Sequence, residues 1–139
     1  MVRLTRASEY GIIALRYLSE KGTDEPDRKI SAREIAAEFG LPFEITAKIL
    51  LKLKSLEFVD SVHGAKGGYF LRRALREIRL TEFLDGMEGP QGVVPCERGV
   101  EEGHTCEYQG KCEVRSGFGK LNRKVQDFLG SIFLSEFIE

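Results

Sequence analysis

The chain of 139 residues has the length of about one domain, and its composition, 42% hydrophobic and 31% charged, is that of an ordinary globular protein. Its apolar runs are too short for a membrane span, and its first residues lack the apolar centre of a signal peptide, so we expect a cytoplasmic protein without a membrane partner. The formal net charge of −1 argues, for the whole chain, against a strongly basic nucleic-acid binder.

The charges are divided unevenly along the chain. Residues 1–80 contain 15 Lys and Arg against 11 Asp and Glu, a net charge of +4, whereas residues 81–139 contain 6 against 11, a net charge of −5. A basic first part indicates a surface that meets a polyanion. Chance clustering of charges on solvated helix faces is the alternative.

The first part of the chain predicts a helix-turn-helix after an initial helix. The initial helix ends before Gly22, and its apolar stripe consists of Tyr10, Ile13, Ala14, Tyr17 and Leu18. Ser31 and Glu34 form a capping box that opens a second helix, and Gly40 ends it. Its apolar face consists of Ala32, Ile35, Ala36 and Phe39.

A third helix follows directly, with Pro42 in its first turn. Its predicted buried side consists of Ile45, Ile49, Leu50, Leu53 and Leu56. Two short helices joined by a glycine-containing turn form a helix-turn-helix, and the second is the recognition helix. Its N-terminal end, where base edges are usually read, has Glu44, Ala47 and Lys48.

A β-hairpin is predicted after the recognition helix. Residues 58–62 and 69–72 have the composition of strands, and the segment between them is rich in glycine and contains His63 and Lys66. A helix-turn-helix followed by such a hairpin is a winged helix, and the hairpin tip suits contact with a phosphate or a narrow groove. The fold class is therefore mainly α with a small β-hairpin wing.

The second part of the chain predicts two further helices and a long intervening loop. Thr81 caps a short helix from Glu82 to about Met87, and residues 88–111 show no periodicity. The last helix, from about Cys112 to Ser131, has a heptad-type seam of Val114, Phe118, Leu121, Val125, Phe128 and Ile132. Packing against the first helix of the same chain would bury this seam, but we favour a long dimerisation helix that pairs with a second copy.

Three cysteines lie in the loop or at its edge, with the spacing C-x9-C-x5-C: Cys96, Cys106 and Cys112. An odd number of cysteines without a secretion signal argues against a disulfide framework. Thiolates suit an iron–sulfur cluster or zinc, with His104 as the nearest fourth ligand, and an unmetallated thiol sensor is the third reading. Structural zinc sites usually contain a tight C-x2-C pair, which is missing here.

Several motifs occur together in an order typical of one family. They are Arg3-Leu-Thr5, Pro42 with Lys48-Ile-Leu50, Ser61-Val-His-Gly64 with Gly67-Gly-Tyr69, and then the three-cysteine loop. The chain resembles the bacterial winged-helix regulators of the IscR/NsrR/RirA type, which are iron–sulfur and nitric-oxide responsive repressors. The resemblance covers essentially the whole chain. It divides the chain into a DNA-binding domain over 1–80 and a part over 81–139 with a sensor loop (88–111) and the dimerisation helix.

The resemblance implies a homodimer that binds a pseudo-palindromic DNA operator under the control of an iron–sulfur cluster, with [4Fe-4S] favoured over [2Fe-2S]. Cys96, Cys106 and Cys112 would be three ligands, although the first gap of nine residues exceeds the family's usual five. Arg115 stands where IscR-like proteins have a ligating histidine, but some relatives use an acidic residue of the partner chain near the start of the first helix. Glu9 of the partner subunit corresponds to that residue and is the expected fourth ligand, and a first-turn glutamate favoured by the helix dipole is the alternative. His104 is the second choice.

The expected function is that of a transcriptional regulator, most simply a repressor, which senses nitric oxide, redox state or iron–sulfur status. The alternatives are a zinc-bound or thiol-only regulator and a small iron–sulfur redox protein. No constellation of catalytic residues is visible, so we expect no enzyme. The residues expected to contact DNA are Arg3, Thr5, Ser31, Arg33, Glu44, Ala47, Lys48, Lys52, His63, Lys66, Gly67 and Tyr69.

Overall fold

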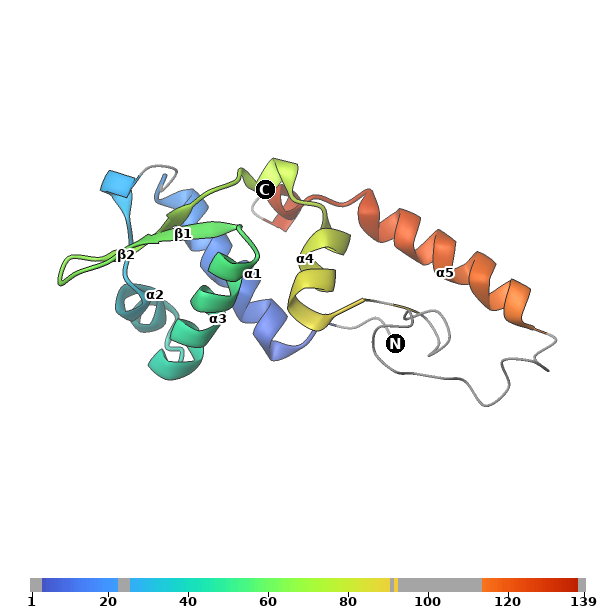
Figure 1. Ribbon diagram of the computed structural model, residues 1–139, viewed down its shortest axis with the longest axis horizontal. Helices are drawn as coiled ribbons and strands as arrows, with labels where there is room; N and C mark the ends of the chain where they lie inside the picture. Colours follow the sequence, from blue (N-terminus) through green and yellow to red (C-terminus); the bar gives the residue numbers. More distant parts are fainter. Residues whose placement is uncertain (1–3, 23–25, 91, 93–113, 138–139) are drawn as a thin grey trace.

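The computed structural model describes residues 4–22, 26–90, 92 and 114–137 and is mostly helical with one hairpin (Figure 1). Helix α1 spans Arg6–Glu20, α2 Ala32–Phe39, α3 Phe43–Ser55, α4 Leu80–Glu88 and α5 Arg115–Gly130. Strands β1 (Val59–Val62) and β2 (Gly68–Leu71) form the hairpin, and short 3₁₀ turns occur at Pro26–Arg28, Leu75–Glu77 and Leu134–Phe137. The expected fold class, a winged helix-turn-helix with a long C-terminal helix, is confirmed.

The helix-turn-helix forms where local signals predicted it. The Ser31 hydroxyl accepts a hydrogen bond from the Glu34 amide at 3.1 Å, which satisfies a free N–H group at the start of α2. Gly40 ends α2 with a left-handed backbone (φ 63°) that glycine adopts without strain. Helix α3 then begins at Phe43, directly after Pro42, and α2 packs against it.

Two apolar residues predicted to be buried on these helices are exposed instead. Ile45 is 46% exposed because the buried stripe of α3 runs one position later, through Thr46, Ile49, Leu50 and Leu53. Phe39 is 41% exposed, since only one edge of its ring packs against Tyr17, in a T-shaped contact with centroids 5.5 Å apart. Both side chains therefore lie at the surface of the helix-turn-helix.

The hairpin is joined to the helix-turn-helix by backbone hydrogen bonds. The strands pair in antiparallel register, with Val59 opposite Leu71 and Val62 opposite Gly68. On its other side, β2 pairs with the residue before the Ser31 cap of α2: the Ile30 amide donates to the Tyr69 carbonyl at 2.9 Å, and the Tyr69 amide donates to the Ile30 carbonyl at 2.7 Å. The wing is thus held at a fixed place beside α2.

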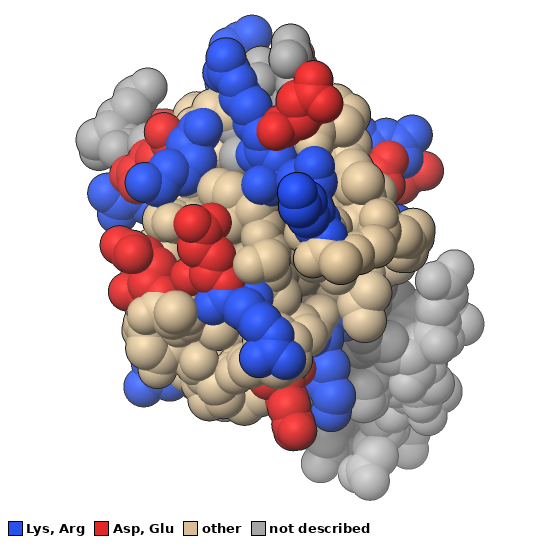
Figure 2. Space-filling model, turned by 90° about the vertical axis from the view of Figure 1, so that its left-hand side faces the viewer, with Lys and Arg blue, Asp and Glu red and all other residues tan. Residues whose placement is uncertain are grey.

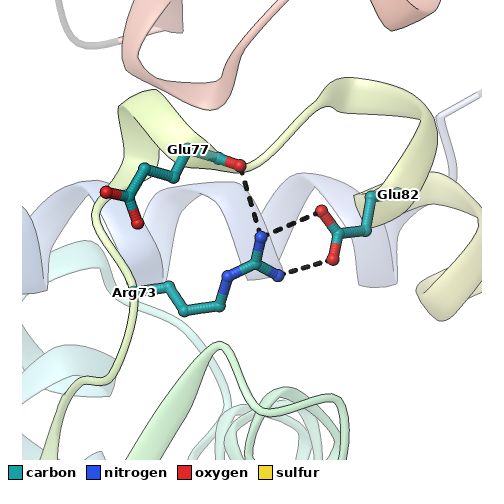
Figure 3. Close-up of polar contacts among 3 residues, drawn as sticks. All are labelled: Arg73, Glu77 and Glu82. Carbon is teal, nitrogen blue, oxygen red and sulfur yellow. Dashed lines mark hydrogen bonds and ion pairs between the residues drawn. The ribbon is translucent and has the colours of Figure 1, made fainter.

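The core is built around α1, which packs against α3, α4 and β2. Its fully buried side chains include Leu15, Leu18, Phe58 and Phe83. Figure 3 shows how Arg73 ties the end of the hairpin to α4: its guanidinium donates to both carboxylate oxygens of Glu82, at 2.5 and 3.2 Å, and to the Glu77 carbonyl at 3.3 Å. This bidentate pair fixes the direction in which the chain enters α4.

Helix α4 does not begin as predicted. Thr81 is not its cap, because α4 starts at Leu80 with Arg79 at the cap position and no side-chain cap there. Phe83 and Leu84 of α4 are buried in the same core as α1. The division of the chain at residue 80 stays a prediction.

Helix α5 extends away from the rest of the molecule (Figure 1). It packs against α4, and Leu129 and Ile132 near its C-terminal end contact the core. Packing of the whole seam against α1 is therefore not found in the described residues, where Phe128 is 66% exposed. Within the described part of the chain, no helix is long and apolar enough to cross a membrane.

Gly68 leads to a prediction about the wing. A Cβ atom at this position would lie 2.8 Å from the carbonyl carbon and oxygen of Ile30, so Gly68→Ala must separate β2 from Ile30. We expect a loss of about 1–3 kcal/mol in the free energy of unfolding, measured with urea. Ala65→Ser at the exposed hairpin tip is the control and should change stability by no more than about 0.5 kcal/mol. An unchanged midpoint for Gly68→Ala would contradict the close approach.

Candidate nucleic-acid interface and sensor junction

The outer face of α3 presents the residues expected to read DNA. Glu44 and Lys48 are exposed and Ala47 is half-buried, on the side of the helix opposite Ile49, Leu50 and Leu53. Leu51, seven residues after Glu44, is on the same side and is 58% exposed. Sequence reasoning did not name Leu51, although its spacing from Glu44 places it on the predicted reading face.

Lys52 is an exposed residue whose ammonium group makes a contact within the protein. Its ammonium donates to the Met87 carbonyl at 3.1 Å, near the end of α4. The structure therefore places this predicted DNA contact at the junction between α3 and α4. The assignment of Lys52 to DNA stays a prediction.

The wing tip and the start of α2 border an open cavity of about 450 Å³. Lys29, Ser31 and Lys66 line it, together with the carboxylates of Asp27 and Glu34. His63 and Lys66 are exposed, whereas burial raises the pKa of the Tyr69 hydroxyl above its usual value. Gly67 has a structural reason to be glycine, because a Cβ atom there would overlap the Val62 carbonyl oxygen.

Basic and acidic side chains are interspersed over the end of the molecule that carries the wing (Figure 2). Arg33 of α2 is exposed there, and its guanidinium carbon lies 4.5 Å from the centre of the Phe43 ring. The net positive charge of residues 1–80 thus does not form one uniform basic surface among the described residues of this face. On this face, attraction for a polyanion would therefore come from individual lysine and arginine side chains rather than from a continuous basic patch.

A second group of polar residues connects the start of α1 to the end of α4. Glu88 accepts hydrogen bonds from the hydroxyls of Thr5 and Ser8, and the Ser8 side chain is fully buried. Burial opposes ionisation of Glu88, but these hydroxyls, the Thr5 backbone and the charge of Lys52 outweigh it, so the pKa of the Glu88 carboxyl is lowered. We call this group (Thr5, Ser8, Lys52, Met87 and Glu88) the sensor junction, because α4 leads in sequence into the expected sensor loop, residues 88–111.

Glu9, the expected fourth ligand, lies in the first turn of α1 and is partly exposed. Its carboxylate pairs with the Arg6 guanidinium at 3.0 Å, and a helix N-terminus stabilises a negative charge there. Cys96, His104, Cys106, Cys112 and Arg3 lie outside the described residues. Within the residues that are described, no three His, Cys, Asp or Glu side chains gather in a way that could hold a metal ion.

Comparisons with known proteins identify the family. The model of the Rrf2 family, described as an iron-dependent transcriptional regulator, matches residues 4–139. The chain belongs to the Rrf2 family. The expected resemblance is confirmed, and this Rrf2 chain is a transcriptional regulator.

Individual relatives agree with this assignment. The NsrR transcriptional regulator of Geobacillus kaustophilus is 25% identical over 99% of this chain and 90% of its own length. Among solved structures, CymR, the global cysteine regulator of B. subtilis, has a TM-score of 0.68 at 20% identity, covering 99% of this chain and 97% of its own. T. potens IscR has a TM-score of 0.66 at 23% identity, covering 99% and 86%. At these identities the solved structures establish the fold of this Rrf2 protein, and its relatives are regulators rather than enzymes.

The pKa of Glu88 leads to a prediction about the sensor junction. Because the folded protein lowers this pKa below 4.5, the stability that the ionised carboxylate contributes is complete above that value and is lost as the pH falls through the folded pKa. We expect Glu88→Gln to lower the free energy of unfolding by about 1 kcal/mol at neutral pH and by less in acid. Urea titrations in steps from neutral pH to below 4.5 measure the difference.

Glu20→Gln is the matched control. The Glu20 carboxylate is exposed at the end of α1 and, among the described residues, forms an ion pair only with Arg16, so its loss should change stability little at any pH. If the loss of unfolding free energy in Glu88→Gln stays the same as the pH falls below 4.5, the ionised form of the Glu88 carboxyl does not stabilise this junction.

Proposed function

We propose that this Rrf2 protein is a homodimeric DNA-binding repressor whose operator binding is controlled by an iron–sulfur cluster. The observation that supports it best is the separation of two exposed regions. One end of the molecule presents the outer face of α3 and the wing, while α5 extends from the other with its apolar seam uncovered (Figure 1). The domain that reads DNA would be residues 1–80, and residues 81–139 would sense and dimerise.

The DNA contacts of the proposal come from three places. The N-terminal end of α3 would enter the major groove with Glu44, Ala47 and Lys48, and the wing tip would approach the adjacent minor groove with His63 and Lys66. The start of α2, with Ser31 and Arg33, would contact the phosphate backbone between them. A dimer with a two-fold axis offers two such surfaces, which suits a pseudo-palindromic operator.

The dimer interface of the proposal is the seam of α5. Val114, Leu121 and Phe128 are exposed and Phe118 and Val125 are partly exposed, so the described chain leaves this part of the seam largely uncovered. Ile132 differs, because it packs against the core and would continue the seam into the body of each subunit. A long helix with an uncovered heptad-type seam is suited to an isologous helix pair.

The residues of this chain suit an iron–sulfur cluster by their chemistry. Thiolates of Cys96, Cys106 and Cys112 are soft ligands for iron, and a carboxylate completes the set as a weaker, more easily lost fourth ligand. Glu9 of the partner subunit would provide it, because this side chain is partly exposed and, among the described residues, forms an ion pair only with the surface residue Arg6. His104 is the other choice. A bound cluster supplies a centre that reacts with nitric oxide and oxygen.

A thiol-only regulator is the second candidate. The fold of this chain is also that of CymR, and three cysteines in one segment could respond to oxidation without a metal. A zinc-bound regulator would share the DNA-binding part and differ only in the sensor. The family match disfavours an iron–sulfur electron carrier, which needs no recognition helix.

Metal analysis of anaerobically purified protein tests the sensor. We expect a coloured protein with iron and acid-labile sulfide, whose affinity for DNA changes after exposure to nitric oxide. Cys106→Ser should contain little iron after anaerobic purification. Glu9→Ala should contain iron at that stage, because a carboxylate ligand is weaker than a thiolate, but its cluster should decay several-fold faster than that of the wild-type protein in air. Glu20→Ala on the same helix is the control.

The outcomes separate the candidates. A colourless protein with stoichiometric zinc would replace the cluster by a zinc site, and a metal-free protein with reversible thiol oxidation would favour the second candidate. Unchanged cluster lability in Glu9→Ala would remove Glu9 as a ligand.

Phe128 tests the dimer. Phe128→Glu places a charge in the α5 seam, at its most exposed side chain, so we expect a monomer and a loss of operator affinity of at least about tenfold, because each subunit then binds one half-site alone. Arg123→Glu, on the opposite side of α5, is the control and should remain dimeric. Sedimentation equilibrium measures the mass of both. A dimeric Phe128→Glu protein would show that α5 is not the interface.

A further inference from the structure

The Arg33–Phe43 contact joins the two helices of the helix-turn-helix at their N-terminal ends. Arg33 is the second residue of α2, and Phe43 is the first residue of α3. The guanidinium carbon lies 4.5 Å from the ring centre, within the distance at which an arginine is attracted to an aromatic face. Phe43 remains 40% exposed, so the ring is not there mainly to fill the core.

Arg33 has an unusual set of partners. Arg6, Arg16 and Arg73 each pair with a carboxylate, through Glu9, Glu20 and Glu82. Arg33 forms no ion pair or hydrogen bond within the described residues, and its guanidinium carbon lies over the Phe43 ring. A guanidinium held in this way keeps its five N–H donors for a ligand while it loses much of its freedom of rotation.

The location indicates the chemistry of the ligand. Arg33 lies against Phe43, the first residue of α3, and stands on the same helix end as the Ser31 cap. Basic and acidic side chains are interspersed on this end of the molecule (Figure 2). Their combined charge therefore attracts a phosphate only weakly, and a specific contact requires a cation held in the right orientation. The oxygen pair of a phosphate group matches the planar fork of a guanidinium.

We propose that Phe43 is a positioning residue, which holds Arg33 in place for contact with a backbone phosphate of the DNA bound by α3. The inference rests on the proposed function, since it requires that the helix-turn-helix binds DNA. It adds a residue that sequence reasoning did not assign, and a reason for an exposed aromatic ring at the start of a recognition helix. Because Arg33 is already ordered in the free protein, its contact with a phosphate costs less side-chain entropy on binding.

A double-mutant cycle tests the proposal on the full-length protein. The variants are Arg33→Ala, Phe43→Leu, both together, and Phe43→Tyr, which keeps the aromatic face. The probes are a fluorescent duplex that the wild-type protein selects from a random-sequence pool, and the unselected pool. Dissociation constants are measured over a series of KCl concentrations, and thermal unfolding verifies that each variant is folded.

Arg33→Ala should weaken binding to both probes and reduce the slope of log K against log [KCl] by about 0.9 for each Arg33 removed. Phe43→Leu should weaken binding about two- to fivefold per subunit, the range expected for loss of an exposed cation–π contact. Phe43→Tyr should restore wild-type affinity. In the double variant, the loss should equal that of Arg33→Ala alone, because Phe43 then has nothing to hold.

Two results would overturn the proposal. Additive losses would mean that Phe43 contacts DNA itself, and a wild-type affinity for Phe43→Leu would mean that Arg33 needs no support. A wild-type protein that selects no duplex from the pool is a different outcome, because it rejects DNA binding and with it the proposed function.

Discussion

The packing of α1 is the constraint on which the rest of the structure depends. Leu15 and Leu18 are fully buried, and the helix that carries them contacts α3, α4, β2 and the C-terminal turn. Close-packed interiors transmit small displacements, so these elements cannot move independently of α1. Gly11 brings α4 especially near: a Cβ atom there would lie 3.1 Å from the Phe83 ring. The recognition helix α3 and the helix α4, which precedes the cysteine-containing residues in the chain, thus both pack against α1.

Charge acts locally in this protein, and its average is misleading. A net charge of −1 counts against nucleic-acid binding, whereas the value of +4 for residues 1–80 favours it. Even within residues 1–80 the positive charge is not continuous at the end that carries the wing, where basic and acidic side chains are interspersed (Figure 2) and Glu34 lines the same cavity as Lys29 and Lys66. The cations differ in their polar partners: the Arg73 guanidinium donates to Glu82 and to the Glu77 carbonyl, while Arg33 lies over an aromatic ring and forms no ion pair or hydrogen bond within the described residues. Attraction of DNA at this end depends on geometry more than on total charge.

Local signals in the sequence predicted most of the fold. Ser31, Glu34 and Gly40 fix the ends of α2 through contacts within a few residues, and the glycine-rich hairpin tip is equally local. Thr81 was misleading, because a threonine that suits a cap can also sit inside the first turn when the preceding residue adopts helical geometry. Ile45 was misleading for a related reason: Thr46, a polar residue that satisfies its hydroxyl on the Pro42 carbonyl at 2.9 Å, takes the buried position instead.

The sensor junction could not be predicted from spacing, because its partners are far apart in the chain. Glu88 meets Ser8 across 80 residues, and Lys52 reaches Met87 across 35. A periodicity can assign Glu88 to the end of a helix, but only tertiary packing decides that it meets two hydroxyls of α1 rather than solvent. These two contacts lie at adjacent positions of α4, one directed to α1 and the other to α3. A displacement of this helix end therefore changes the polar contacts of both helices at once, and the three cysteines follow this helix in the sequence.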